Sequence, residues 1–109
     1  MSKNTKLWYM YRDASNYKLH IDVVLTGEMT PEQWETILSC CDDREYFAPA
    51  KVGLEARDFV AMGYQPYDDD PELFEIVEYS HTDLNPTVQM TVEELVTKFQ
   101  ANKGKWYTI

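Results

Sequence analysis

The chain has 109 residues, a length that suits one domain with a single core. Hydrophobic residues make up 44% of it and aromatic residues 14%, which excludes the apolar-poor composition of a disordered chain. The net charge of −9 argues against direct binding to nucleic-acid backbones or anionic membranes, because both attract basic surfaces. We therefore expect one folded domain over residues 1–109.

The first predicted element is a β-hairpin. Residues 17–25, YKLHIDVVL, alternate between apolar and polar side chains, which is typical of a half-buried strand. The preceding LWYMYR is rich in aromatic residues and has strand propensity. The four residues DASN between the two runs favour a turn, in which Asn16 tolerates a positive φ. The pattern predicts two antiparallel strands joined by this turn.

Two helices are predicted from the same kind of start signal. Thr30 is the expected N-cap of the first helix and Gln33 completes a capping box, while Thr91 and Glu94 repeat the arrangement for the second. The first helix should end near 42–44. The expected core faces are Trp34, Ile37, Leu38 and Cys41 in the first helix, and Val92, Leu95, Val96 and Phe99 in the second.

The remaining segments complete the predicted sheet. EYFAPAKVGL, residues 45–54, contains a short aromatic run broken by Pro49, which indicates a short strand. ELFEIVEY and PTVQM lie on either side of SHTDLN and predict a second hairpin. The expected fold is α+β, in the order ββα-β-ββα, with an antiparallel sheet of about 4–5 strands and two helices on one face.

The ends of the chain differ in charge from its middle. Residues 22–94 carry 18 carboxylates against Arg44, Lys51 and Arg57, a balance of −15. Within this stretch, YDDDPE places Asp68, Asp69, Asp70 and Glu72 close together. Their spacing lacks the alternating ligands of a calcium loop, so we predict a surface for a basic protein partner and no metal site.

Positive signs of catalysis are absent from the sequence. The glycines are isolated, and no phosphate-binding loop, GxSxG, HExxH or paired CxxC motif occurs. The adjacent Cys40 and Cys41 suit neither an unstrained disulfide nor shared metal ligation, so we expect reduced, packed thiols. No apolar run reaches the roughly 20 residues that cross a bilayer, and no secretory signal is present. We predict a cytoplasmic protein with no catalytic residue, no cofactor and no membrane contact.

One segment offers an alternative to the protein-binding hypothesis. YRDASNYK brings a phenol, a guanidinium and a carboxylate together in the predicted hairpin, and the adjacent strand adds an imidazole. A small enzyme or ligand-binding domain could use a pocket at this place. The four candidate residues are Tyr11, Arg12, Asp13 and His20.

YRDASNYK, EYFAPAKVGL and the C-terminal KGKW also carry a resemblance. Together they are similar to segments of a group of small uncharacterised bacterial proteins, some of them from mobile elements. The resemblance covers chiefly the first half and the extreme C-terminus, and it implies no activity, catalytic residue or cofactor.

Three functions follow as hypotheses. The leading one is a small, acidic, non-enzymatic protein-binding or inhibitor protein, in its sharpest form a mobile-element decoy whose carboxylates imitate a phosphate backbone and bind a basic nucleic-acid-binding host protein. The second is the pocket near the first hairpin. The third is a homodimeric structural protein that associates through an exposed sheet edge.

Overall fold

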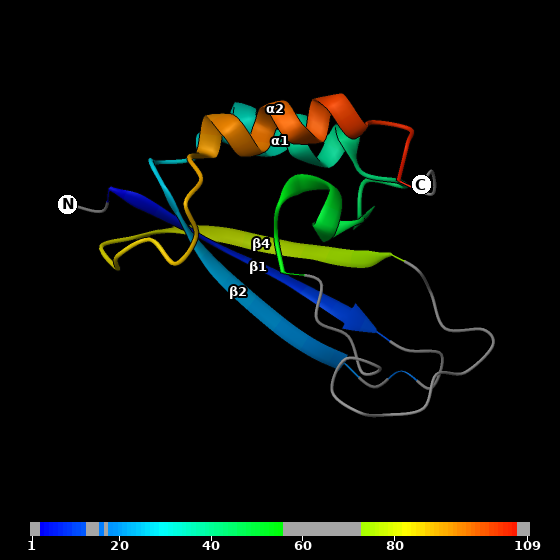
Figure 1. The fold of residues 1–109 in the computed structure, drawn as a ribbon, viewed down its shortest axis with the longest axis horizontal. Helices are drawn as coiled ribbons and strands as arrows, with labels where there is room; N and C mark the ends of the chain where they lie inside the picture. Colours follow the sequence, from blue (N-terminus) through cyan, green and yellow to red (C-terminus); the bar gives the residue numbers. More distant parts are fainter. Residues whose placement is uncertain (1–2, 13–15, 17, 56–72, 107–109) are drawn as a thin grey trace.

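The computed structural model describes residues 3–12, 16, 18–55 and 73–106. It confirms the α+β class, with a four-stranded antiparallel sheet in the order β2-β1-β4-β3. Both helices lie on one face of this sheet (Figure 1). The elements are β1 (Asn4–Arg12), β2 (Lys18–Thr26), α1 (Pro31–Cys40), β3 (Tyr46–Phe47), the 3-10 helix η1 (Pro49–Val52), β4 (Phe74–Thr82) and α2 (Val92–Asn102).

The predicted first hairpin is present as β1 and β2. Its register pairs Leu7 with Val23 and Trp8 with Asp22, so alternate side chains point to opposite faces. The inward set, which the helices cover, consists of Thr5, Leu7, Tyr9 and Tyr11 in β1 and Ile21, Val23 and Leu25 in β2. Asn16 has a φ of 69°, as expected at the end of the turn.

Both predicted helix starts are confirmed. Thr30 accepts a hydrogen bond from the Gln33 N–H and Thr91 accepts one from the Glu94 N–H, and each capping box is complete. The two helices begin at the same end of the sheet (Figure 1). A backbone hydrogen bond from the Thr26 N–H to the Met90 carbonyl (3.1 Å) ties the start of α2 to the end of β2.

The first helix ends at Cys40, earlier than the predicted 42–44. Cys41 is extended, with φ −73° and ψ 150°, and its N–H donates to the Leu38 carbonyl. Asp43 and Arg44 then have φ values of 52° and 59°. A right-handed helix cannot continue through such residues, so the turn and not the apolar spacing sets the end of the helix.

The core is centred on aromatic rings from distant parts of the chain. Phe47 of β3 is fully buried, and its ring centroid lies 5.5 Å from that of Tyr9, 5.3 Å from Phe99 and 6.3 Å from Trp106. The short predicted strand at 45–54 is thus present, and it places one phenylalanine between the sheet and α2. Trp106, the last described residue, belongs to the same cluster.

The predicted second hairpin is wrong in its second strand. Residues 86–90, PTVQM, form no strand against β4 and instead lie beside β2. The Thr87 N–H donates to the Val24 carbonyl (3.0 Å), and the Val24 N–H donates to the Thr87 hydroxyl (2.8 Å). One side of β4 is already paired with β1, and the chain crosses the end of the sheet to reach the far edge. The observed order is therefore ββα-β-βα.

Candidate functional site

The structure separates the residues of the predicted hairpin pocket. Tyr11 is 5% exposed and lies on the helix-covered face, with its ring centroid 5.1 Å from that of Phe74. Arg12 points to the opposite face, and His20 is exposed there, across from Met10. Asp13 lies outside the described residues. The structure thus does not bring Tyr11 together with Arg12 and His20, and the part of the hypothesis that concerns Asp13 stays a prediction.

The predicted partner-binding residues also lie outside the described part of the chain. These are Asp68, Asp69, Asp70 and Glu72, which belong to the range 56–72. Their role remains a prediction from sequence alone.

Arg12 is instead the centre of a charged cluster at the end of β1. Its Nε lies 2.9 Å from Glu75 Oε2, and a second guanidinium nitrogen donates to Glu75 Oε1 at 3.4 Å. In a third contact, Arg12 Nη1 donates to Asn16 Oδ1 at 2.7 Å. The Glu75 side chain is 10% exposed and that of Arg12 is 38% exposed. The guanidinium thus compensates a nearly buried carboxylate, which would otherwise be costly to place there.

Glu45 adds a second carboxyl to this cluster. Burial, a hydrogen bond with the Glu75 side chain, and the negative charges of Glu75 and Asp43 raise the pKa of Glu45, while Arg12 opposes the shift. The charge of Glu45 is in turn the main cause of a raised pKa at Tyr46. Two carboxyl groups that share a hydrogen bond favour retention of a proton between them.

This arrangement makes stability depend on pH. Because Glu45 binds its proton more tightly in the folded state, its contribution to the free energy of unfolding is largest below the unfolded pKa and falls as pH rises through the folded pKa. We expect Glu45→Gln to be more stable relative to the wild type at pH 7 than at pH 4. Urea unfolding at both pH values measures this difference.

The control for this prediction is the same pair of proteins in a Glu75→Gln background. Removing the Glu75 charge removes two of the causes of the Glu45 shift. The pH dependence of the Glu45→Gln effect should therefore shrink in that background. An equal dependence in both backgrounds would contradict the shared-proton arrangement.

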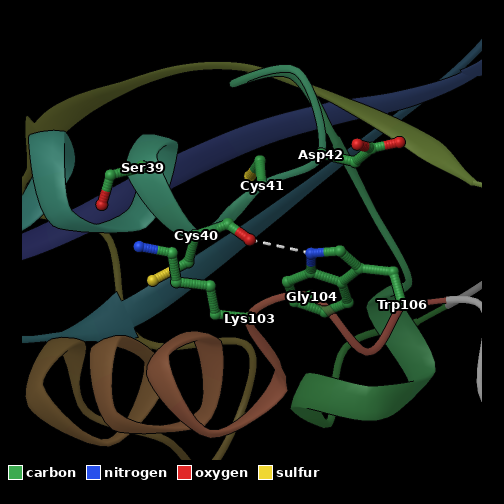
Figure 2. A pocket seen from close by; sticks show the side chains of 7 residues that line it. All are labelled: Ser39, Cys40, Cys41, Asp42, Lys103, Gly104 and Trp106. Carbon is green, nitrogen blue, oxygen red and sulfur yellow. Dashed lines mark hydrogen bonds between the residues drawn. The ribbon is translucent and has the colours of Figure 1, made fainter.

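A cavity of about 270 Å³ lies elsewhere, where the end of α1 meets the segment after α2. Figure 2 shows the side chains around it, with the Trp106 indole directed toward the end of α1. The indole N–H donates to the Cys40 carbonyl (2.8 Å), which satisfies one of the free carbonyls of the helix end. The lining residues are Ser39, Cys40, Cys41, Asp42, Lys103, Gly104 and Trp106.

Two cysteines line this cavity. Cys40 and Cys41 are free and buried, as predicted. Burial, reinforced by Cys40, raises the pKa of Cys41 to about 12, so its thiol stays protonated near neutral pH. The thiolate is the nucleophilic form of cysteine, so Cys41 is a packing residue and not a reactive group.

Exposed carboxylates gather where both helices begin. Thr26 and Thr91 form a parallel bridge, and a Cβ at Gly27 would lie 3.8 Å from Glu93 Oε2. The start of α2 therefore lies beside the segment that leads into α1, and the acidic residues in the first turn of each helix suit the positive end of its dipole. We call this group the acidic end; it consists of Glu28, Glu32, Glu93 and Glu94, all exposed.

Within residues 3–12, 16, 18–55 and 73–106, no group of three or more histidine, cysteine or acidic side chains is placed to hold a metal ion. No helix in this part of the chain has the length and apolarity to cross a membrane.

Sequence reasoning missed Glu45, Glu75 and Trp106 as members of clusters. Glu75 interrupts the apolar run ELFEIV at a position that faces away from the helices. A carboxylate within an apolar run is a sign of a buried charge that needs a partner. Nothing in the sequence pairs it with Arg12, 63 positions away. Trp106 stands out in the sequence only as part of KGKW, which indicates no contact with the end of the first helix.

Comparisons of the chain with protein-family models, with curated proteins and with solved structures find no match.

Proposed function

We propose that this protein is a small non-enzymatic binding domain that recognises a basic partner protein through its carboxylates. In its most specific version, the proposal is that the protein is a decoy, carried by a mobile element, that occupies the nucleic-acid site of a basic host protein. The observation that carries the proposal is the exposure of the carboxylates. Of those in the described residues, only Glu75 is buried and only Glu45 is half-buried.

The acidic end supports the proposal because its exposed carboxylates lie at the starts of two helices that begin at the same end of the sheet (Figure 1). Clustered charge steers an oppositely charged partner and can raise association rates by about 10 to 10³. The described ion pairs, Arg12 with Glu75 and Arg44 with Glu35, involve none of these four residues. The sequence adds Asp68, Asp69, Asp70 and Glu72 as a second candidate surface.

Three variants with equal charge changes test the proposal. Each replaces four carboxylates with their amides and so changes the net charge from −9 by four, to −5. The first alters the acidic end, in which Glu94→Gln keeps a capping side chain. The second alters Asp68, Asp69, Asp70 and Glu72. The third is a control at four other exposed carboxylates: Asp22, Asp42, Glu78 and Asp83.

Binding is measured against a panel of purified basic nucleic-acid-binding proteins, with a polylysine surface as the non-specific reference. We expect at least one member to bind more tightly than polylysine, and its affinity to fall at least tenfold between about 50 mM and 500 mM salt. One of the first two variants should weaken this binding at least tenfold more than the control. Equal effects of all three variants, or no binding above polylysine, would overturn the proposal.

A further inference from the structure

Most of the outer edge of β4 is unpaired within the described part of the chain. β3 pairs with Phe74 and Glu75, and the Ile76 N–H donates to the Glu45 carbonyl at 2.8 Å. Beyond Ile76, no strand or backbone hydrogen bond from the rest of the described chain meets this edge. An open edge of this kind is a template for another strand.

The hydrogen-bonding direction of β4 follows from the other side of the sheet. The N–H and C=O of Val24 in β2 both point outward, to Thr87. Since these groups alternate along an antiparallel strand, the odd-numbered residues of β2 bond to the odd-numbered residues of β1, such as Val23 to Leu7. The even-numbered residues of β1 therefore point their backbone groups toward β4.

The even-numbered residues of β1 determine which backbone N–H and C=O groups of β4 point toward the outer edge. Trp8 of β1 faces Glu78 of β4, so the backbone of Glu78 points inward. The N–H and C=O groups of Tyr79 and His81 then point outward. The outward bond from Ile76 agrees with this assignment, because the irregularity in the register lies between Ile76 and Glu78.

We propose that a second copy of this chain pairs with β4 as an antiparallel strand, about a two-fold axis at Ser80. A two-fold axis perpendicular to the sheet places the helix-covered faces of both copies on the same side. With such an axis, one residue of the strand faces the same residue of the other copy. With the axis at Ser80, Tyr79 of one copy faces His81 of the other. Four backbone hydrogen bonds form, and they use all the outward groups of both residues in both copies.

The side chains of β4 complement themselves in this register. Glu78 of one copy faces Thr82 of the other, so no like charges are directly opposite. Val77 is 44% exposed and Leu84 is 55% exposed, and they are the exposed large apolar residues of the described chain. They lie at the two ends of the free segment. In this register Val77 of one copy faces Asp83 of the other, next to Leu84.

Hydrogen exchange of the unaltered protein tests the register amide by amide. We expect the amides of Tyr79 and His81 to become at least tenfold more protected as protein concentration rises through the dissociation constant. The amides of Glu78 and Ser80 should change little, because they bond to β1 in either state. Uniform protection, or exchange independent of concentration up to about 1 mM, would overturn the proposal.

A pair of variants at His81 tests the same edge by sedimentation. His81→Pro removes an outward N–H, and a proline is tolerated at such an edge position. His81→Ala removes the imidazole, including its 2.8 Å contact with the Met29 carbonyl, but keeps the N–H. We expect the proline to weaken dimerisation about 30-fold and the alanine by less than about threefold. Equal weakening by both would overturn the backbone pairing.

Salt separates this inference from the proposed function. Each copy carries a charge of −9, so added salt should strengthen self-association by screening repulsion. It should weaken the binding of a basic partner. Each can therefore fail without the other.

Discussion

Replacing Phe47 with alanine is expected to lower the free energy of unfolding by about 3–5 kcal/mol. Phe47 is fully buried, and its ring contacts the rings of Tyr9, Phe99 and Trp106. It thus joins the sheet, α2 and the C-terminal segment at one point. Because a domain of this size is stable by only about 5–15 kcal/mol, the variant should be close to unfolding at 25 °C. Urea unfolding followed by tryptophan fluorescence measures the loss.

The matched control is Leu84→Ala, which removes an apolar side chain that is 55% exposed. At a protein concentration low enough to keep the chain monomeric, its cost should be within about 0.5 kcal/mol, as for surface substitutions in general. A second variant, Phe47→Leu, keeps most of the volume and should lose less than Phe47→Ala. A small loss for Phe47→Ala would mean that the aromatic cluster does not hold these elements together.

Replacing Trp106 with alanine is expected to cost a similar amount, about 3–5 kcal/mol. Trp106 is 5% exposed and contributes both a ring and a donor. Its ring centroid lies 5.4 Å from that of Phe99, and its N–H satisfies the Cys40 carbonyl at the end of α1. Losing both should release the C-terminal segment from the helices.

Trp106→Phe separates the two contributions. It keeps an aromatic ring but leaves the Cys40 carbonyl without the indole donor, which should cost about 1–3 kcal/mol. Urea unfolding, with far-UV circular dichroism as the signal, measures both variants. An unchanged stability for Trp106→Phe would show that water replaces the indole N–H in the adjoining cavity, and that the hydrogen bond adds little.

Local signals in the sequence predicted the helices and the first hairpin because each depends on neighbours in the chain. The side chains of Thr30 and Thr91 cap within three residues, and the alternation in 17–25 needs only one partner strand. The class and the helix-covered face of the sheet followed from these elements. The second hairpin failed because the PTVQM segment was read by its local propensity, while its actual partner, Val24, is 63 positions away.

The charged cluster and the cavity were beyond sequence reasoning for the same reason. The sequence offered Arg12 as a pocket residue beside Asp13, whereas in the structure its guanidinium pairs with Glu75. Alternation along β1 alone, however, places Tyr11 and Arg12 on opposite faces. This alternation can be read from the sequence alone, and it counts against the hypothesis of a pocket at the first hairpin.

The strand order has a consequence for the synthesis of this protein. β1 lies between β2 and β4, yet its second neighbour follows it late in the chain: Trp8 pairs with Glu78, about 70 residues further on. At about 5–20 residues per second, the ribosome needs roughly 4–14 s to make that stretch. From the completion of β2 until β4 is made, the nascent hairpin has an apolar face and leaves one side of β1 unpaired. Chaperone binding and mispairing with neighbouring chains therefore compete at β1 until β4 is made.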